Sequence, residues 1–371
     1  MIKKGEMTMY GNEAIIYMNQ FESFVKQERV IKEDERVNKK EYEAFVEEHC
    51  MGSFLQSVDW GAVKEGWISR QVVTRGKDGN INASMQVLIK KIPYLNISYM
   101  YAPRGPVCDF ADEDGLRELM KEVDKLQKRY HAFAFKTDPC IEEGDRVAIE
   151  NLKKVGFEYL ITKDGYDTIQ CRSNYVLDLA GKSCEELYAA FRKKHRYNIR
   201  VAERKGVECS FFGIEKVEDF YQLMIETGER DGFKIRSKEY YARLIRKLGN
   251  KAKLCMCYYE GMPVSGALII NYGGRMSYLY GASSNNHREV MANYLMHWTI
   301  IKHCKELGCS IYDFMGIPYY YDKDHKNYGV YRFKKGFSGR VVNYAGEFEK
   351  VYYPLIGRMI LKVMNLLGYK L

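Results

Sequence analysis

The chain has 371 residues, which at roughly 150 residues per domain favours two domains over one. Hydrophobic residues make up 46% and charged residues 29%, with only 7 prolines, so the disordered, collagen-like and low-complexity classes are excluded. The formal charge is 58 − 49 = +9, a mild basic excess that favours a polyanionic partner.

The cysteine pattern and the hydropathy indicate a cytoplasmic protein. Ten cysteines occur at irregular spacings that match neither a zinc site nor a thioredoxin motif, so we expect all ten to be reduced thiols. Cys255 and Cys257 alternate in a strand-like run and are expected to face the same side as core residues. The sequence shows neither a secretory signal nor an apolar stretch of about 18 residues that could span a membrane. We expect no metal site, because the histidine spacings match none.

The first half of the chain predicts a meander of strands followed by helices that return to a sheet. Residues 1–36 are charged and weakly patterned, and we treat them as an N-terminal extension. The elements expected next are a helix over 39–49, strands over 67–75, 81–90 and 95–102, a helix over 111–130, a strand over 131–136 and a helix over 144–155.

A basic helix is predicted over 184–205. Ser183 and Glu186 form a capping box at its start, and Gly206 closes its end. Four arginines recur every four residues and predict one stripe along a helix face: Arg192, Arg196, Arg200 and Arg204. A phosphate backbone would relieve their mutual repulsion and bind in a salt-dependent way. The alternative is a solvated face, or one paired with acids from elsewhere in the fold.

The second half repeats the order of the first. Strands are expected over 252–259, 263–271 and 275–281, followed by a helix over 288–307 and a strand over 309–315. A constant offset of 179 residues carries Tyr101 onto Tyr280 and Phe135 onto Phe314. This register predicts a duplicated unit, although two α/β domains could share element lengths by chance. The element order indicates an α/β (α+β) fold, compatible with an acyltransferase-like fold used twice.

Two basic segments could bind an anionic substrate. Lys64 follows the short apolar helix start around Trp60 and could meet an anion, or be an ordinary surface lysine. Arg236 and Tyr240 lie four residues apart on an expected helix, so together they could grip a diphosphate. Taken singly, each of these two residues is more often structural.

Two further segments could carry the chemistry of a transfer reaction. Lys334, preceded by Phe333, lies among aromatic residues and could supply a fixed positive charge to a developing oxyanion. The alternative for that segment is a basic β-hairpin. Asp138 ends a predicted strand and is a candidate base, but an Asp before Pro139 is also an ordinary turn starter.

Several nucleotide and hydrolase motifs are missing from the sequence. It contains no phosphate loop, no strand-coupled GxGxxG, no GxSxG and no HExxH. The turn by which ordinary N-acetyltransferases hold the coenzyme A pyrophosphate is also missing from both halves. Acyl donors without phosphates, or donors held in another way, therefore become more attractive.

Taken together, nine short segments resemble the FemABX family of aminoacyl-tRNA-dependent peptidyltransferases, which build peptidoglycan side chains. They occur in the family's order over about 38–354, and the ordered set is specific although each segment alone is weak. The segments are FLQSxxWGxxK at 54–64, YxPRGPV at 101–107, KxDP at 136–139, KxGF at 154–157, RxNIR at 196–200, TxxRDGF at 227–233, YLYGAS at 278–283, YDFxGI at 312–317 and FKxGF at 333–337.

The resemblance implies two tandem GNAT-like acyltransferase domains with a mixed sheet each. They would cover residues 37–172, completed by the C-terminal segment 343–371, and residues 173–342. Some family members carry a coiled-coil arm in the second domain. Here Gly206 runs directly into residues 207–212, so the chain resembles the armless, FemX-like members.

The resemblance also implies the reaction. An aminoacyl group would pass from aminoacyl-tRNA to the stem-peptide side-chain amine of UDP-MurNAc-pentapeptide or lipid II, building the interpeptide bridge of the cell wall. Aminoacyl-tRNA would be a co-substrate, with no further cofactor, and the protein would act as a cytoplasmic monomer. Two alternatives stay open, namely a coenzyme A-dependent N-acyltransferase and a non-catalytic tRNA-binding module.

Site residues follow from the same resemblance, position by position. Lys334 matches the lysine that stabilises the tetrahedral intermediate, with Phe333 beside it. Asp138 matches an aspartate proposed as base, which we rank below Lys334 because the substrate can assist its own deprotonation. The arginine stripe is then explained as tRNA contact. Residues that match contacts to the nucleotide-sugar diphosphate and its muramyl peptide are Lys64, Arg236, Tyr240 and Tyr280.

A last helix is predicted over 354–369, with one apolar face and with Arg358 and Lys362 opposite. It is too short to span a bilayer. The apolar face would pack on the core or, alternatively, rest on the inner face of the membrane near a lipid-linked precursor.

Overall fold

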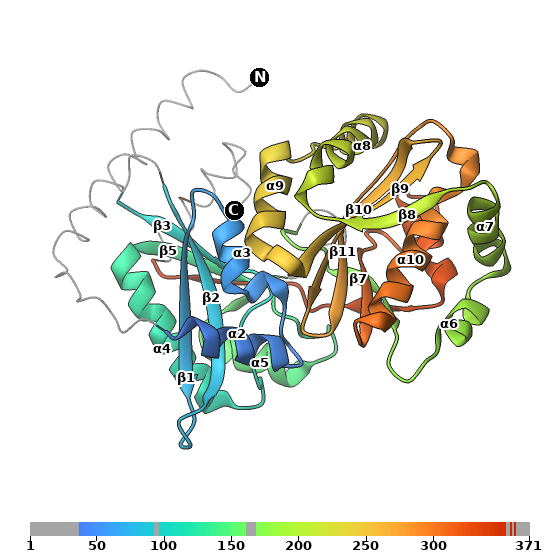
Figure 1. The fold of residues 1–371 in the computed structure, drawn as a ribbon. Helices are drawn as coiled ribbons and strands as arrows, with labels where there is room; N and C mark the ends of the chain where they lie inside the picture. Colours follow the sequence, from blue (N-terminus) through green and yellow to red (C-terminus); the bar gives the residue numbers. More distant parts are fainter. Residues whose placement is uncertain (1–36, 93–95, 161–167, 354–356, 358–359, 361–371) are drawn as a thin grey trace. The chain divides into compact units, whose positions relative to one another are not determined.

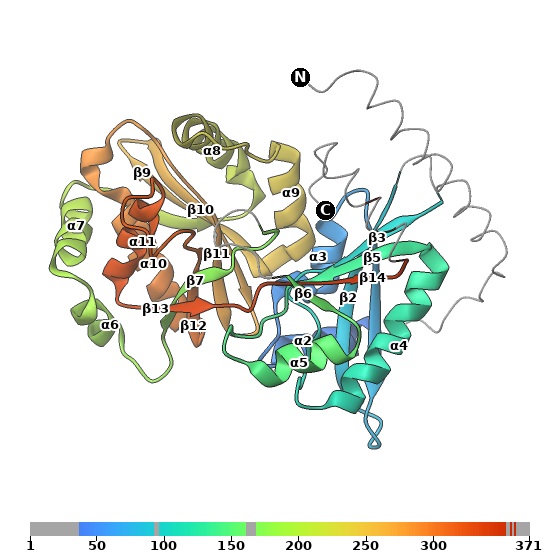
Figure 2. The ribbon, with the colours of Figure 1, turned by 180° about the vertical axis from the view of Figure 1, so that it is seen from behind.

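The computed structural model of the chain describes residues 37–92, 96–160, 168–353, 357 and 360. These residues form two compact units, each built on its own seven-stranded mixed sheet (Figures 1 and 2). Unit 1 contains the described residues up to 170 and those from 344 onward, and unit 2 contains residues 171–343. The predicted α/β class with one mixed sheet in each half is confirmed.

The sheet of unit 1 has the strand order β1-β2-β3-β5-β14-β6, with β4 paired to β2. The neighbours β1, β2 and β3 are antiparallel, and β3 and β5 are parallel. The strands are β1 (Ile68–Arg75), β2 (Ile81–Lys91), β3 (Ser98–Ala102), β4 (Val107–Cys108), β5 (Ala132–Thr137), β6 (Glu158–Leu160) and β14 (Glu347–Val351). The helices are α2 (Lys39–Glu48), α3 (Val58–Val63), α4 (Glu113–Tyr130) and α5 (Arg146–Lys154), with a 3₁₀ turn at Phe54–Gln56.

Helix α4 shows why these elements form where the sequence predicts them. The side chain of Asp112 accepts a hydrogen bond from the backbone N–H of Gly115 and caps the first turn, so the helix starts two residues later than predicted. Its apolar residues recur at helical spacing and are buried against the sheet: Leu116, Leu119, Met120, Val123 and Leu126. The chain leaves the helix at His131 in the left-handed conformation and enters β5.

The sheet of unit 2 has the order β13-β7-β12-β11-β10-β9-β8. Its strands are β7 (Ser173–Asp178), β8 (Glu208–Phe212), β9 (Ala252–Tyr259), β10 (Met262–Tyr272), β11 (Arg275–Ser283), β12 (Ile311–Gly316) and β13 (Arg340–Asn343). Its helices are α6 (Cys184–Ala190), α7 (Lys193–Arg204), α8 (Val217–Asp231), α9 (Lys238–Leu248), α10 (Ala292–Glu306) and α11 (Tyr328–Lys334). Short 3₁₀ turns lie at Ile214–Lys216, Gly249–Lys251, Arg288–Val290 and Lys335–Phe337.

Helices cover both faces of this second sheet. Ala267 of β10 belongs to the core cluster of α10, whereas a side chain on the preceding Gly266 would meet Phe220 of α8. Successive residues of a strand point to opposite faces, so α10 and α8 lie on opposite sides of β10.

The two units repeat one plan, as the sequence offset predicts. In each, three antiparallel strands lead through a long helix to a strand that pairs in parallel with the third: β1-β2-β3, α4 and β5 in unit 1, and β9-β10-β11, α10 and β12 in unit 2. The offset of 179 residues carries both ends of β5 onto both ends of β12, and the start of α4 onto the start of α10. This register favours duplication over chance.

The single helix predicted over 184–205 is wrong. Helix α6 ends at Ala190, Phe191 is extended, and α7 begins at Lys193 after Arg192. The break lets the buried ring of Phe191 pack against Trp298 and Phe337, at centroid distances of 5.6 and 5.2 Å. Tertiary packing of one aromatic side chain therefore overrides a locally favourable helical pattern.

The expectation of ten reduced thiols is also wrong. Cys209 and Cys257 lie directly opposite each other on β8 and β9 and form a disulfide. The two cysteines are 48 residues apart in the chain, so their spacing gave no sign of the pairing. Cys255 and Cys257 both face the core of unit 2, as expected from their alternation.

The sequence also made predictions about the two ends of the chain and about a coiled-coil arm in the second domain. Strand β8 starts at Glu208, directly after α7, so the predicted absence of a coiled-coil arm is confirmed. The N-terminal extension and most of the helix predicted over 354–369 lie outside the described residues. Ile360, which is described, is buried in unit 1 with Leu88 and Tyr99. Over the described ranges, no helix is both long and apolar enough to cross a membrane.

Candidate active site

Lys334 is held by three backbone carbonyls. It lies in the last turn of α11 with its side chain 7% exposed. Its Nζ donates to the carbonyl oxygens of Phe314, Met315 and Gly316 at 2.6, 3.3 and 2.7 Å. These carbonyls lie at the end of β12, where Met315 adopts a positive φ of 60° and turns the chain. The alternative of a basic β-hairpin is wrong, since the segment is helical.

The buried position of Lys334 among these three carbonyls, called its cage below, determines its protonation state. Burial lowers its pKa to about 8, while the nearby Cys171 and Asp313 act in the opposite direction. The side chain is therefore largely an ammonium ion at neutral pH. The bond to Met315 is the longest of the three, so its N–H is the one most easily given to a substrate oxyanion.

An aromatic cluster surrounds the helix turn that carries Lys334. The half-buried ring of Phe333 packs against Tyr294, His297 and Phe337 at centroid distances of 5.1 to 5.5 Å. The backbone oxygen of Phe333 accepts a hydrogen bond from His195 Nε2 at 2.9 Å. Burial, and then the charge of Lys334, lower the pKa of His297 to about 3, so this imidazole is neutral.

Sequence reasoning missed both histidines of this cluster. His195 and His297 lie on separate helices, and each is buried. A histidine on an apolar helix face is more often core than functional, so no sequence signal separates these two from ordinary core residues.

Arg236, Tyr240 and Tyr280 lie together in unit 2. The guanidinium of Arg236 lies 5.5 Å from the ring centroid of Tyr240, and the Tyr280 hydroxyl donates to that of Tyr240 at 3.4 Å. Burial raises the pKa of Tyr240 well above its ordinary value, so its hydroxyl stays protonated. One exposed cation beside two hydroxyls suits a phosphate or diphosphate group.

The helical spacing predicted for Arg236 and Tyr240 is wrong in detail. Ser237 caps α9 by accepting from the backbone N–H of Tyr240, so Arg236 precedes the helix. Its guanidinium reaches the Tyr240 ring from the loop and not from one helical turn away. The neighbouring Arg230 is structural, because it donates to the Ser283 carbonyl at 2.9 Å and ties α8 to β11.

Asp138 lies in unit 1, just after β5, and is 2% exposed. Its Oδ1 accepts from the backbone N–H of Arg104 and its Oδ2 from the Tyr101 hydroxyl, both at 2.7 Å. Burial raises its pKa to about 6, although the charge of Arg104 opposes that rise. Arg104 is itself buried, with its guanidinium 4.2 Å from the Tyr344 ring centroid. Both carboxylate oxygens are thus engaged, one by the backbone of Arg104 and the other by Tyr101 of β3, which supports the structural alternative more than the base.

Lys64 caps the C-terminus of α3 in unit 1 and is half-buried. Its ammonium lies 4.4 Å from the ring centroid of Trp60, which is buried and anchors the short helix. Gly61 allows α3 to approach the sheet, because a Cβ there would clash with the side chains of Ser69 and Gln86. The packing of Trp60 and Gly61 against the rest of unit 1 therefore fixes the position of α3, whose C-cap is Lys64.

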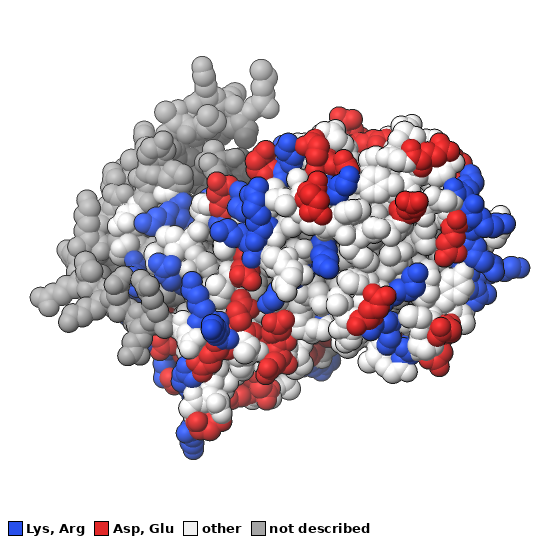
Figure 3. Space-filling model, in the orientation of Figure 1, with Lys and Arg blue, Asp and Glu red and all other residues white. Residues whose placement is uncertain are grey.

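The arginine stripe predicted along one helix is wrong as a set of four. Arg192 occupies the N-cap position of α7, outside the helix, and its side chain makes no capping hydrogen bond. Arg196 is half-buried and its guanidinium donates to the Ala189 carbonyl at the end of α6. Arg200 and Arg204 are exposed on α7. Figure 3 shows Lys and Arg side chains gathered over this helix, at the right of the view.

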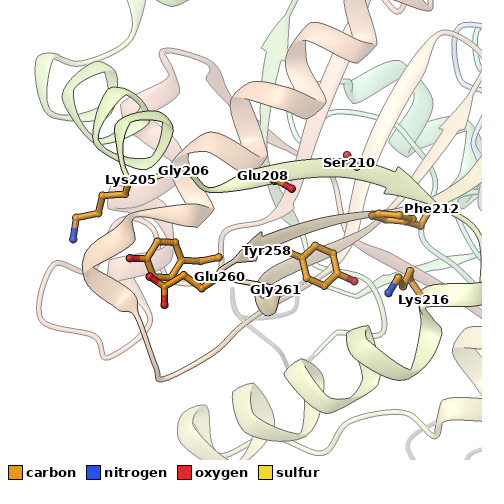
Figure 4. A pocket seen from close by; sticks show the side chains of 10 residues that line it. Lys205, Gly206, Glu208, Ser210, Phe212, Lys216, Tyr258, Glu260 and Gly261 are labelled. Carbon is orange, nitrogen blue, oxygen red and sulfur yellow. The ribbon is translucent and has the colours of Figure 1, made fainter.

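A cavity of about 570 Å³ opens elsewhere on unit 2, at the edge formed by β8 and β9 (Figure 4). Its walls carry two cations and two carboxylates, so it has no net preference for an anion. None of the site residues predicted from the sequence lines it. The lining residues are Lys205, Gly206, Glu208, Ser210, Phe212, Lys216, Tyr258, Tyr259, Glu260 and Gly261.

The repeated α/β plan of the two units is that of a tandem acyltransferase-like fold. The chain belongs to the FemAB family, whose model matches residues 37–260 and 258–362. It is 29% identical over 398 residues to a lipid II:glycine glycyltransferase of Staphylococcus haemolyticus (strain JCSC1435), covering 88% of this chain and 94% of the relative. The corresponding protein of Staphylococcus aureus (strain USA300) is 28% identical over 400 residues, with the same coverage.

Solved structures agree with this assignment. The crystal structure of FemX superposes with a TM-score of 0.82 at 28% identity, covering 89% of this chain and 100% of FemX. A tandem GNAT protein from the clavulanic acid biosynthesis pathway superposes with a TM-score of 0.52 at 9% identity, over 84% and 94% of the two chains. At that identity the likeness concerns the fold alone, and it confirms that the fold is GNAT-like.

Proposed function

We propose that this protein is an aminoacyltransferase that moves an amino acid from aminoacyl-tRNA to the stem-peptide side-chain amine of a peptidoglycan precursor. Membership of the FemAB family and similarity to relatives named lipid II:glycine glycyltransferases support the peptidoglycan acceptor. The observation that carries the chemistry is the buried ammonium of Lys334, fixed by three carbonyls.

In the proposed reaction the acceptor amine attacks the ester carbonyl that links the amino acid to the terminal ribose. A tetrahedral intermediate forms with negative charge on the former carbonyl oxygen. Lys334 stabilises that charge, a role for which a preorganised and poorly hydrated cation is well suited. The new C–N bond then persists, the ester C–O bond breaks, and the amine proton ends on the ribose hydroxyl. No cofactor beyond aminoacyl-tRNA is required.

Basic and hydroxyl side chains are proposed to hold the acceptor. Arg236, Tyr240 and Tyr280 present a guanidinium and two hydroxyls at one place, which fits the diphosphate of UDP-MurNAc-pentapeptide or of lipid II. Lys64, whose ammonium lies 4.4 Å from the ring centroid of Trp60, is a separate candidate contact to the acceptor. Asp138 remains a candidate base that ranks below Lys334, since its carboxylate already accepts two hydrogen bonds.

The RNA donor is proposed to contact α7. This helix begins beside the segment of Lys334, because the Arg192 N–H donates to the Gly336 carbonyl at 2.9 Å and His195 donates to that of Phe333. An RNA held by Arg200 and Arg204 would therefore lie on the same unit as the caged lysine. Because aminoacyl-tRNA and the peptidoglycan precursor meet in the cytoplasm, the protein is proposed to act there, in peripheral contact with the inner face of the membrane. We propose that it acts as a monomer.

A donor-exchange experiment tests this proposal. Purified protein is mixed with UDP-MurNAc-pentapeptide or lipid II, and with either total tRNA charged with labelled amino acids or acetyl-coenzyme A. Label from charged tRNA should enter at least one acceptor, and the acetyl group should enter neither. Acetyl transfer without aminoacyl transfer would instead establish the coenzyme A alternative, and RNA binding without any transfer would indicate a binding module.

A further inference from the structure

One aromatic ring stands exposed in the middle of the basic helix α7. The side chain of Tyr197 is 54% exposed, whereas its helix neighbours His195 and Ile199 are buried. At about 100° per residue, Tyr197 falls in the sector that points away from this buried side. We call this sector the outer face of α7, and its members are Lys193, Tyr197, Arg200 and Arg204, all exposed.

The outer face offers both charge and a flat apolar surface. Three of its four side chains are cations, and Glu203 is the sole acid in the sequence of α7. A ring among cations matches the two needs of a single-stranded nucleic acid, which binds through its phosphates and through stacking of its bases.

The position of α7 relates its outer face to the reaction. The N-terminus of the helix is joined to the Lys334 segment by the hydrogen bond from Arg192 to Gly336. Tyr197 follows that end by about one helical turn, and the 12-residue helix extends for about 18 Å. An RNA whose acylated end reaches Lys334 and which also contacts the outer face of α7 would meet Tyr197 near that end.

We infer that Tyr197 stacks on an unpaired base near the acylated end of the RNA donor, while Lys193, Arg200 and Arg204 contact its phosphates. The inference rests on the proposed function and names a contact that the arginine spacing alone did not reveal. Stacking requires an unpaired or terminal base, so the contact discriminates single-stranded RNA ends from blunt duplexes.

A membrane surface is a less suitable partner for this helix. Helices that lie on a bilayer direct a broad apolar face outward. In α7 the apolar side chains face the core of unit 2, with Ile199 and Ala202 buried, and the outer face presents one ring. Charge complementarity with RNA therefore accounts for the outer face better than insertion into lipid does.

The test measures RNA affinity as a function of salt. The probes are uncharged tRNA, a hairpin with a four-nucleotide unpaired 3′ end, and the same hairpin with a blunt end. Tyr197→Ala should weaken binding of tRNA and of the tailed hairpin about tenfold, leaving the blunt hairpin and the salt dependence unchanged. Tyr197→Phe keeps the ring and should bind as the wild type does. Arg200→Ala should reduce the slope of log K against log[salt] by about 0.7.

Four results would overturn the inference. Unchanged binding of the tailed hairpin by Tyr197→Ala would exclude stacking while leaving aminoacyl transfer intact. Equal losses on tailed and blunt hairpins, with a lowered melting temperature, would make Tyr197 a structural residue. Binding to anionic phosphatidylglycerol vesicles that depends on Tyr197, without RNA binding, would make α7 a membrane contact. Failure of the wild type to bind any RNA would overturn both the inference and the tRNA donor, whereas the first two results leave the donor standing.

Discussion

Lys334 is the residue whose replacement should reduce the transfer rate most. Replacing it with methionine keeps the length of the side chain but removes the ammonium and its three N–H donors. Loss of one preorganised donor to an oxyanion lowers kcat by about 10²–10³-fold in enzymes where this has been measured. We expect a loss of at least that size for Lys334→Met, because the charge disappears together with the donor. KM for either substrate should change little, since the interaction matters mainly after the amine has attacked.

The neighbouring lysine provides a matched control. Lys335 is exposed, and its ammonium lies 5.3 Å from the ring centroid of Tyr331. Lys335→Met removes the same charge from the same segment and should retain activity close to that of the wild type. Comparison of the two variants thus separates the caged charge from the general basicity of the segment.

A folding defect must be distinguished from a catalytic one. Lys334→Met leaves three carbonyl oxygens without their donor, and each unsatisfied buried group can cost about 1–3 kcal/mol. Thermal melting is therefore measured alongside steady-state transfer at saturating substrates. A folded Lys334→Met protein that keeps kcat within a few-fold of the wild type would refute the electrostatic role.

Three further predictions follow from the same geometry. Because burial lowers the pKa of Lys334 to about 8, the ammonium is present below that pH, and kcat should fall as pH rises through about 8. Arginine keeps its charge to a higher pH, so an active Lys334→Arg variant should show this fall at higher pH. Arg236→Ala should raise KM for the diphosphate acceptor about tenfold or more with little change in kcat, whereas the exposed Arg246→Ala should leave KM unchanged. Asp138→Asn should lower the melting temperature, because the Asp138 carboxylate accepts two buried hydrogen bonds, and should lower kcat by less than about tenfold. A general base contributes about 10²–10⁴-fold to the rate, so a loss of kcat in that range by a stably folded variant would show that Asp138 is the base.

Much of the fold could be predicted because local patterns and tertiary structure agree. The helical periodicity of the apolar residues in α4 matches its buried face. The repeat offset found in the sequence maps β5 onto β12 without a residue of slippage. Where the two levels conflict, as at Phe191, the packing of one aromatic ring decides and the sequence pattern fails.

The candidate site was only partly accessible from the sequence. The sequence predicted that Arg236, Tyr240 and Tyr280 would act together, but the approach of Arg236 to Tyr240 depends on where α9 is capped. The groups that hold Lys334 are backbone carbonyls, which every residue has, so no side-chain pattern in the sequence predicts this arrangement. The disulfide between Cys209 and Cys257 could not be predicted either, because it depends on the register in which β8 pairs with β9.

The most direct test of the central claim asks where the amino acid is attached. Wild-type protein and charged tRNA are incubated with the peptidoglycan precursor in two forms, one with a free stem-peptide side-chain amine and one with that amine acetylated. Mass spectrometry of the products should show the addition of an aminoacyl residue to the free amine and none to the acetylated precursor. Transfer to the blocked precursor, or no transfer to the free one, would contradict the proposed reaction.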